Sequence, residues 1–160
     1  MEHPKAIGDR TTLAVMQALQ TTGYAVSVPF GENVRYDLVI DDGETLRRVQ
    51  CKTGRLREGA IRFATCSCYG HHLRPSESRR DYHGQVDCFA VHCPETDGVY
   101  LISIEDLPVR VQAALRVDPR DSRNGQRKYI RFAATYEIGR VSVRATREPR
   151  ASSGARGSSS

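Results

Sequence analysis

A strand–turn–strand pattern at residues 35–53 constrains the fold more than any other part of this sequence. Residues 38–40 are apolar and lead into Asp41-Asp42-Gly43-Glu44, which is typical of a tight hairpin turn. Residues two apart on a strand point to the same face, so Gln50 and Lys52 project together. The hairpin can bring Asp37 to that face as well. Polar side chains are costly to gather without partners, so this pattern indicates a functional site.

The pattern resembles the core motif of the PD-(D/E)xK nuclease superfamily. It is most similar to the branch of group I intron homing endonucleases, in which Gln can take the (D/E) position. The similarity rests on Asp37 and Gln50-x-Lys52 and extends over roughly residues 5–138. Further matching segments are Gly23-Tyr24, Pro29-Phe30-Gly31-Glu32-Asn33, Arg35-Tyr36-Asp37 and Val49-Gln50-Cys51-Lys52-Thr53-Gly54. The resemblance implies an α/β fold with a restriction-endonuclease-like core, in which helices flank a central mixed sheet.

The resemblance also implies roles for the three motif residues in DNA cleavage. Asp37 would bind Mg²⁺ (or Mn²⁺), Gln50 would supply an oxygen ligand or orient a water, and Lys52 would position the attacking water or stabilise phosphate charge. Mg²⁺ prefers oxygen ligands, and a nearby cation stabilises the transition state, so these residue types suit the chemistry. The resemblance therefore predicts a metal-dependent DNA endonuclease. By residue type alone, such an Asp and Lys are also common surface features.

The first helix departs from the family pattern. The family commonly places a Glu there, and the aligned residue is Thr12. Asp9 lies three residues earlier on the same helix face, so it is a candidate substitute ligand for the metal. Asp37 would then be the one certain anionic ligand. A catalytically inactive nuclease-fold domain that only binds DNA therefore stays open as an alternative.

Positive charge is concentrated after the motif. The formal net charge is +5, and residues 144–160 hold four arginines and one glutamate. Residues 53–80 hold six arginines and two glutamates. The arginines predicted to contact DNA phosphates are Arg55, Arg57, Arg62, Arg74, Arg79 and Arg80. A solvated basic loop explains the same charge equally well.

Five cysteines raise a weaker alternative, a zinc-binding interaction module. Cys66-Ser67-Cys68 is followed by His71-His72, and His92-Cys93 lies further along. The C-x-C spacing differs from the C-x₂₋₄-C of zinc fingers and ribbons, and Cys88 lies in an apolar strand sequence. Free cysteines are often buried, so structural thiols are the favoured interpretation.

The remaining pattern predicts one domain, residues 1–143, and a disordered tail rich in Arg, Ser and Gly, residues 144–160. The expected helices cover residues 8–22 and 107–116, and the expected strands cover residues 24–30, 38–40, 47–52, 61–68, 86–92, 99–104 and 130–133. Residues 70–84 contain three histidines and are expected to form a loop at one wall of the site. A catalytic histidine there is a weaker hypothesis.

The sequence has no apolar run as long as a membrane helix, and its first residues do not resemble a secretory signal. A soluble cytoplasmic protein with DNA as its partner is therefore expected. A small domain that cuts both strands would need a second copy, so a homo-oligomer is also considered.

Overall fold

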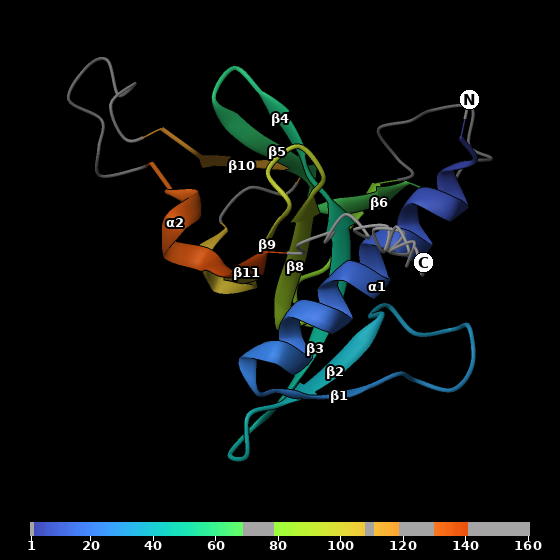
Figure 1. The fold of residues 1–160 in the computed structure, drawn as a ribbon. Helices are drawn as coiled ribbons and strands as arrows, with labels where there is room; N and C mark the ends of the chain where they lie inside the picture. Colours follow the sequence, from blue (N-terminus) through green and yellow to red (C-terminus); the bar gives the residue numbers. More distant parts are fainter. Residues whose placement is uncertain (1, 69–78, 108–110, 119–129, 141–160) are drawn as a thin grey trace, which may run out of the picture.

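The centre of the molecule is a mixed sheet of six strands in the order β1-β2-β3-β8-β9-β11 (Figure 1). The computed structural model describes residues 2–68, 79–107, 111–118 and 130–140. The strands of this sheet are β1 (Ala25–Ser27), β2 (Leu38–Asp41), β3 (Leu46–Thr53), β8 (Cys88–Cys93), β9 (Gly98–Ser103) and β11 (Glu137–Arg140). β3 and β8 run parallel, and the other neighbouring pairs are antiparallel. The predicted central mixed sheet is confirmed.

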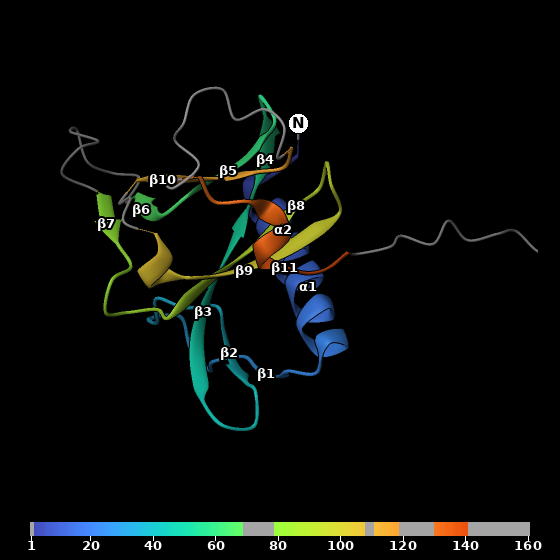
Figure 2. The same ribbon diagram turned by 90° about the vertical axis from the view of Figure 1, so that its left-hand side faces the viewer.

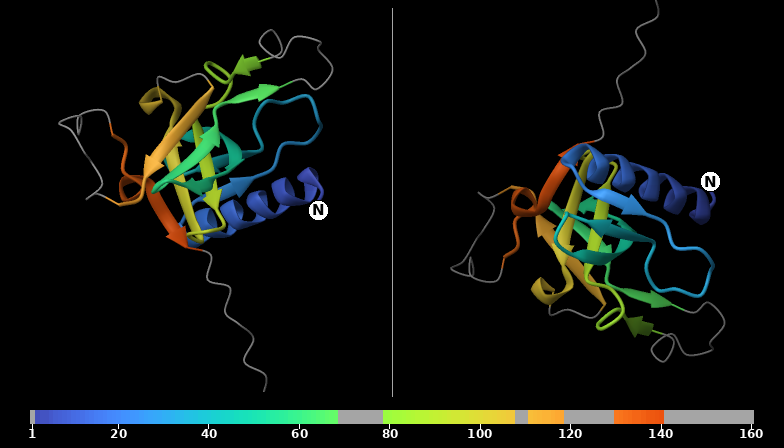
Figure 3. Two further views of the ribbon diagram at one scale, coloured as in Figure 1. Left: turned by 90° about the horizontal axis from the view of Figure 1, so that it is seen from above. Right: turned by 90° about the horizontal axis from the view of Figure 1, so that it is seen from below.

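Two further layers cover the faces of this sheet (Figure 3). The helix α1 (Pro4–Thr22) lies on one face, and a three-stranded sheet in the order β10-β5-β4 lies on the other. The smaller elements are β4 (Arg55–Arg57), β5 (Ala60–Ala64), β10 (Gln112–Arg116), the hairpin of β6 (Cys66–Cys68) and β7 (Arg79–Asp81), the 3₁₀ helix η1 (Ile104–Asp106) and α2 (Ala133–Tyr136). Figure 2 shows β6 and β7 at the end of the molecule that also holds β5 and β10. The predicted α/β class is thus confirmed.

The central strand β8 is buried on both faces. Cys88 and Ala90 pack in the core beneath α1, whereas Phe89 and Val91 pack in the core beneath the three-stranded sheet. Residues that alternate along a strand point to opposite faces, so a strand between two layers must be apolar at every position. This arrangement explains the near-continuous apolar sequence of residues 86–92.

α1 begins at Pro4 rather than at residue 8, because its start is well capped. The side chain of His3 accepts a hydrogen bond from the Lys5 N–H at 3.3 Å. Proline suits the first turn of a helix, where its missing N–H costs nothing. Val15 and Leu19 are fully buried against the sheet and fix the orientation of the helix.

The prediction of a helix at residues 107–116 is wrong. The structure has η1 at Ile104–Asp106 and then the strand β10, which pairs antiparallel with β5. Within β10, Ala113 and Leu115 are buried while Gln112 and Ala114 are exposed, which is the period of a strand. Tertiary pairing therefore overrides the helical propensity of an Ala-Ala-Leu-Arg sequence.

Other predicted boundaries also shift. The strand expected at residues 130–133 is wrong: Phe132 makes a single bridge to Arg116, and the strand that completes the sheet is β11. Residues 61–68 divide at Thr65 into β5 and β6, because β5 pairs with β4 and β10 while β6 pairs with β7. The expected tail at residues 144–160 lies outside the described residues. Among the described helices, none has the length and apolar character needed to cross a membrane.

Gly54 joins β3 to β4 at a point too crowded for a side chain. A Cβ there would lie 2.6 Å from Ile61 Cγ2 and 2.8 Å from Val91 Cγ1. Both neighbours are buried and β-branched, so they cannot easily move aside. Gly54→Ala is therefore expected to lower the free energy of unfolding by about 1–3 kcal/mol in urea denaturation.

Gly8→Ala is the matched control for this prediction. Nothing lies within 4 Å of a Cβ at Gly8, and the residue is within α1, so the same substitution is expected to leave stability unchanged or higher. Equal denaturation midpoints for the two variants would contradict the crowding argument.

Candidate active site

β3 presents the motif residues on the face of the sheet that points away from α1. Val49 and Cys51 are buried in the core beneath α1, so strand alternation directs Gln50 and Lys52 to the opposite face. Asp37 lies just before β2, and its N–H donates to the Val49 carbonyl at 2.8 Å. This hydrogen bond continues the β2–β3 ladder and holds Asp37 beside β3.

Asp37 and Gln50 are in direct contact. Asp37 Oδ2 accepts a hydrogen bond from Gln50 Nε2 at 2.7 Å and another from the Cys51 N–H at 2.8 Å. Burial raises the pKa of the Asp37 carboxyl above its ordinary value, although the Cys51 N–H and the positive charge of Lys52 lower it in part. The structure therefore brings together the three motif residues that the sequence predicts to converge.

Lys52 is held by a tyrosine outside the motif. Its Nζ donates to the Tyr82 hydroxyl at 3.2 Å and to the Cys66 carbonyl at 3.4 Å, and it lies 4.7 Å from the centroid of the Tyr82 ring. Tyr82 is buried and packs edge-on against Phe89, with ring centroids 5.6 Å apart. An ammonium group has three donors, so these two acceptors leave one N–H for a phosphate or a water.

Arg35 brings a second cation to this tyrosine. Its guanidinium carbon lies 4.4 Å from the centroid of the Tyr82 ring, which is a cation–π distance. Tyr82 therefore contacts both Lys52 and Arg35. Neither contact of Tyr82 is predicted from the sequence. The available signals were the position of Arg35 two residues before Asp37 and the place of Tyr82 in the segment expected to form a wall.

The donor set at Asp37 suits a magnesium or manganese ion. Asp37 and Gln50 offer a carboxylate and an amide oxygen, and Mg²⁺ commonly uses one or two carboxylates together with waters and substrate phosphates. Both hydrogen bonds to Asp37 end on Oδ2, so Oδ1 is the candidate metal-binding oxygen. In the described part of the chain, no three His, Cys, Asp or Glu side chains gather as a metal-ligand cluster. A metal at Asp37 would therefore take most of its ligands from water and DNA.

The first helix contributes a hydroxyl near this strand. The Thr12 side chain donates to the Gly8 carbonyl at 3.1 Å and hydrogen-bonds the Cys51 thiol, so it lies on the α1 side of β3. Asp9 is exposed on α1. Its role as a metal ligand stays a prediction.

Three of the predicted DNA-binding arginines lie on the small sheet. Arg55 and Arg57 are exposed on β4, and Arg62 is half-buried on β5. Arg55 lies 4.0 Å from Glu95 and Arg62 lies 3.3 Å from Glu58 as ion pairs. Exposed ion pairs are worth little energetically, so a phosphate can displace either glutamate.

The other predicted site residues fall at the edge of the described structure or beyond it. Arg79 and Arg80 lie on β7, whose backbone pairs with β6. Arg74, His71 and His72 lie outside the described residues, and His83, the third histidine of residues 70–84, is exposed in the turn after β7. The hypothesis of a catalytic histidine in that segment therefore stays a prediction, as do the DNA contacts of these arginines.

The described cysteines agree with the interpretation as structural thiols. Cys51, Cys66, Cys88 and Cys93 are all free and buried. Burial raises the pKa of the Cys88 thiol to about 11 and also raises that of Cys51, so both remain protonated at neutral pH. Zinc binding needs thiolates, and the described residues contain no cluster that would supply them.

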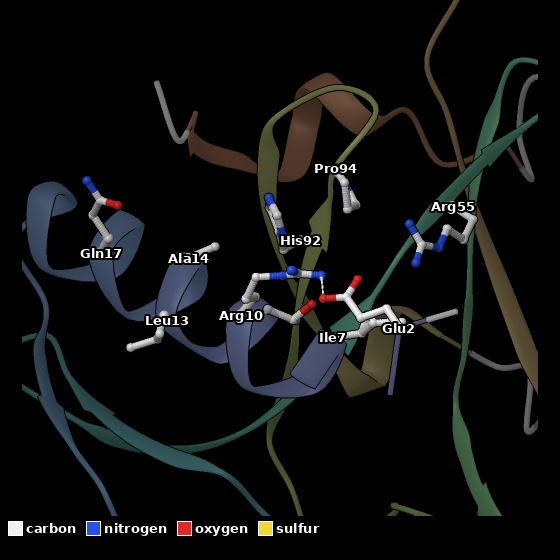
Figure 4. Close-up of a pocket in the computed structure, with 10 residues that line it drawn as sticks. Glu2, Ile7, Arg10, Leu13, Ala14, Gln17, Arg55, His92 and Pro94 are labelled. Atoms are coloured by element: carbon white, nitrogen blue, oxygen red, sulfur yellow. Dashed lines mark ion pairs between the residues drawn. The ribbon is translucent and has the colours of Figure 1, made fainter. Parts of the chain in front are cut away.

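A separate cavity of about 460 Å³ lies between α1 and the turn after β8 (Figure 4). Ile7, Leu13 and Ala14 supply apolar walls, and Arg55 and His92 face it from the strands. Asp37, Gln50 and Lys52 do not line it. The candidate active site is thus on the opposite face of β3 from this cavity.

Tyr82→Phe is expected to lower DNA cleavage about fivefold to tenfold, because one hydrogen bond to the Lys52 ammonium is lost while the ring and its contacts stay. Single-turnover cleavage rates measure this effect, and the denaturation midpoint should change little. Tyr136→Phe is the control, because Tyr136 packs against the same core. Equal losses in the two variants would contradict a positioning role for the Tyr82 hydroxyl.

Comparisons with known proteins identify the family and the fold. The family model described as PD-(D/E)XK endonuclease matches residues 2–139. The solved structure of a bacterial homing endonuclease, I-Ssp6803I, superimposes with a TM-score of 0.66 at 21% sequence identity, covering 85% of this chain and 89% of that one. At this identity the likeness shows a shared fold. A search of curated proteins gives no match.

Proposed function

Because this chain belongs to the PD-(D/E)XK endonuclease family, we propose that it hydrolyses DNA phosphodiester bonds with the help of Mg²⁺ (or Mn²⁺). The observation that carries the proposal is the contact of Asp37 with Gln50, with Lys52 on the same face of β3. A family fold with a carboxylate, an amide oxygen and an ammonium at one point suits phosphodiester hydrolysis. We also propose that the enzyme acts in the cytoplasm.

Each motif residue has a defined task in this proposal. Asp37 holds the ion, which when bound polarises the phosphate and lowers the pKa of a water. Gln50 offers Oε1 to the ion while its Nε2 keeps the Asp37 carboxylate in place. Lys52, fixed by Tyr82 and the Cys66 carbonyl, directs its remaining N–H at the attacking water or at a phosphate oxygen.

The first test is cleavage of DNA by the purified full chain. Supercoiled plasmid and a randomised duplex library are incubated with Mg²⁺, with Mn²⁺ or with chelator. Cleavage in either metal that the chelator abolishes is the expected result. Absence of cleavage across the library, together with metal binding at Asp37 measured by calorimetry, would overturn the catalytic part of the proposal.

A second candidate function is a catalytically inactive domain that only binds DNA. Thr12 favours it, because a hydroxyl stands where the family commonly has a carboxylate. This candidate predicts DNA affinity that is unchanged by metal or chelator. The endonuclease should bind its DNA more tightly with metal than with chelator, because an ion held by Asp37 would add positive charge at the site.

A double-strand cut sets a further requirement. One site reaches one phosphodiester at a time, so we propose that a second copy of the chain supplies the second site. The ratio of nicked to linear plasmid, measured with the mass of the protein–DNA complex in solution, tests this arrangement. Linear product formed directly by a single copy would contradict it.

A further inference from the structure

The three-stranded sheet β10-β5-β4 has one apolar face. Leu56, Ile61 and Phe63 from β4 and β5, with Ala113 and Leu115 from β10, pack into the core against the six-stranded sheet. Their strand neighbours must point the other way. The pairing registers therefore define what the outer face carries.

The outer face carries arginines at four positions. Arg62 pairs with Arg55 on one side and with Ala114 on the other. In the next row, Ala60 pairs with Arg57 and with Arg116. Gln112, opposite Ala64, ends the face. We call this surface the arginine face, with the residues Arg55, Arg57, Arg62, Gln112 and Arg116. Arg55 is at its edge and also lines the cavity beside α1.

Small residues separate these long side chains. Ala64 and Ala114 are exposed and Ala60 is buried between Arg57 and Arg116, so the face has no bulky apolar side chain above the backbone. The strands themselves bear no acid. Glu95 and Glu58, which lies in the β4–β5 turn, pair with Arg55 and Arg62. Asp118 follows β10 two residues after Arg116. The four arginines outnumber these three acids.

The arginine face is close to the candidate active site along the chain. β5 continues past Thr65 into β6, and the first residue of β6, Cys66, accepts a hydrogen bond from Lys52. Arg62 and Cys66 are four positions apart in the sequence, which is a span of at most about 13 Å. A short stretch of chain therefore joins the face to the candidate active site.

We infer that the arginine face docks on the phosphate backbone of duplex DNA beside the bond that is cut. The inference rests on the proposed function and adds β10 to the DNA-binding surface. A sheet can lie along a duplex, arginines bind phosphates bidentately, and phosphate contacts set register and orientation. The charge of the face fits a regular polyanion.

Salt dependence of DNA binding tests the inference without requiring cleavage. Fluorescence anisotropy in chelator compares wild type with Arg57→Gln/Arg62→Gln. Each lost phosphate contact should reduce the slope of log affinity against log salt by about 0.9. Arg10→Gln/Arg140→Gln is the matched control, because both are exposed and ion-paired like Arg62 but lie on α1 and β11. Equal slopes in the two double variants would overturn the inference.

A substitution that should strengthen DNA binding provides a second test. Glu58 and Gly59 form the β4–β5 turn with φ of +49° and +72°, which suits Asn-Gly. Glu58→Asn removes the acid that pairs with Arg62 and should tighten DNA binding. Unchanged affinity would count against docking at this face.

Crosslinking locates the contact directly. Ala114→Cys lies on the arginine face and Ala25→Cys lies on β1 at the far end of the molecule (Figure 1). After modification with a photoreactive azide, only Ala114→Cys should crosslink to duplex DNA, with wild type as the background. Crosslinking from Ala25→Cys alone would overturn the inference.

The inference and the proposed function can fail separately. If wild type binds DNA through the arginine face but never cleaves it, the proposed function fails and the inference stands. If wild type cleaves DNA and the variants of the arginine face bind DNA normally, the proposed function stands and the inference fails.

Discussion

Asp37→Asn is expected to abolish metal-dependent DNA cleavage while the protein stays folded. The substitution removes the one carboxylate of the candidate metal site, and loss of Lewis-acid stabilisation worth several kcal/mol corresponds to a rate decrease of about a thousandfold. The asparagine carbonyl can still accept the hydrogen bonds from Gln50 Nε2 and the Cys51 N–H. Single-turnover kinetics measure the loss of cleavage, and Mn²⁺ titration measures the loss of metal binding.

The stability of this variant should move in the other direction. The pKa of Asp37 is raised in the folded protein by burial, so folding favours its neutral form. The neutral Asp37 carboxyl therefore makes its full contribution to the free energy of unfolding below the pKa of an unfolded Asp, about 4. This contribution is lost as the pH rises through the pKa of Asp37 in the folded protein. At pH 7 in chelator, Asp37→Asn should therefore unfold at the same or higher denaturant concentration than wild type, and the difference should shrink as pH falls toward 4.

Asp106→Asn is the control for both measurements, because Asp106 is exposed on η1. Cleavage by Asp37→Asn at the wild-type rate would place the metal elsewhere. A large loss of stability in Asp37→Asn would mean that the charged carboxylate stabilises the fold, which would contradict the raised pKa of Asp37.

Lys52→Met is expected to slow cleavage by about 10²–10³-fold, the usual cost of removing one preorganised electrostatic group from a transition state. Methionine keeps a long unbranched side chain against the Tyr82 ring but removes the ammonium. DNA affinity should change little, because many other cations contribute to binding. Rates at saturating enzyme, compared with affinity measured in chelator, separate the two effects.

Lys5→Met provides the control, since Lys5 is exposed on α1. Cleavage that persists at the wild-type rate in Lys52→Met would indicate another site or a contaminating nuclease. A parallel loss of affinity and rate would instead assign Lys52 to DNA binding.

The parts of the site that the sequence predicts are those encoded locally. Asp37, Gln50 and Lys52 lie on one hairpin, so the turn at residues 41–44 and the two-residue period of a strand suffice to bring them together. Tyr82 is 30 residues from Lys52 in sequence, and Arg35 reaches it only through the folded core. No local pattern contains such contacts.

The errors in secondary structure have a similar cause. β10 has a helix-favouring sequence, and pairing with β5 decides its conformation. The same pairing places Arg116 opposite Ala60 and Gln112 opposite Ala64, so a helix assignment at residues 107–116 hides two of the five residues of the arginine face. Strand pairing between distant segments is the information that a single sequence supplies least.

The position of β11 bears on how the chain folds during synthesis. β11 pairs with β9, Thr22 at the end of α1 donates to the Ile138 carbonyl at 2.9 Å, and Ala18 lies 3.6 Å from the position of a Cβ on Gly139. The first helix thus finds part of its packing surface in one of the last strands described. In a nascent chain, the part of α1 that packs on β11 therefore stays uncovered until residue 140 has left the ribosome. Fusions or truncations that delay or remove β11 should increase aggregation during expression.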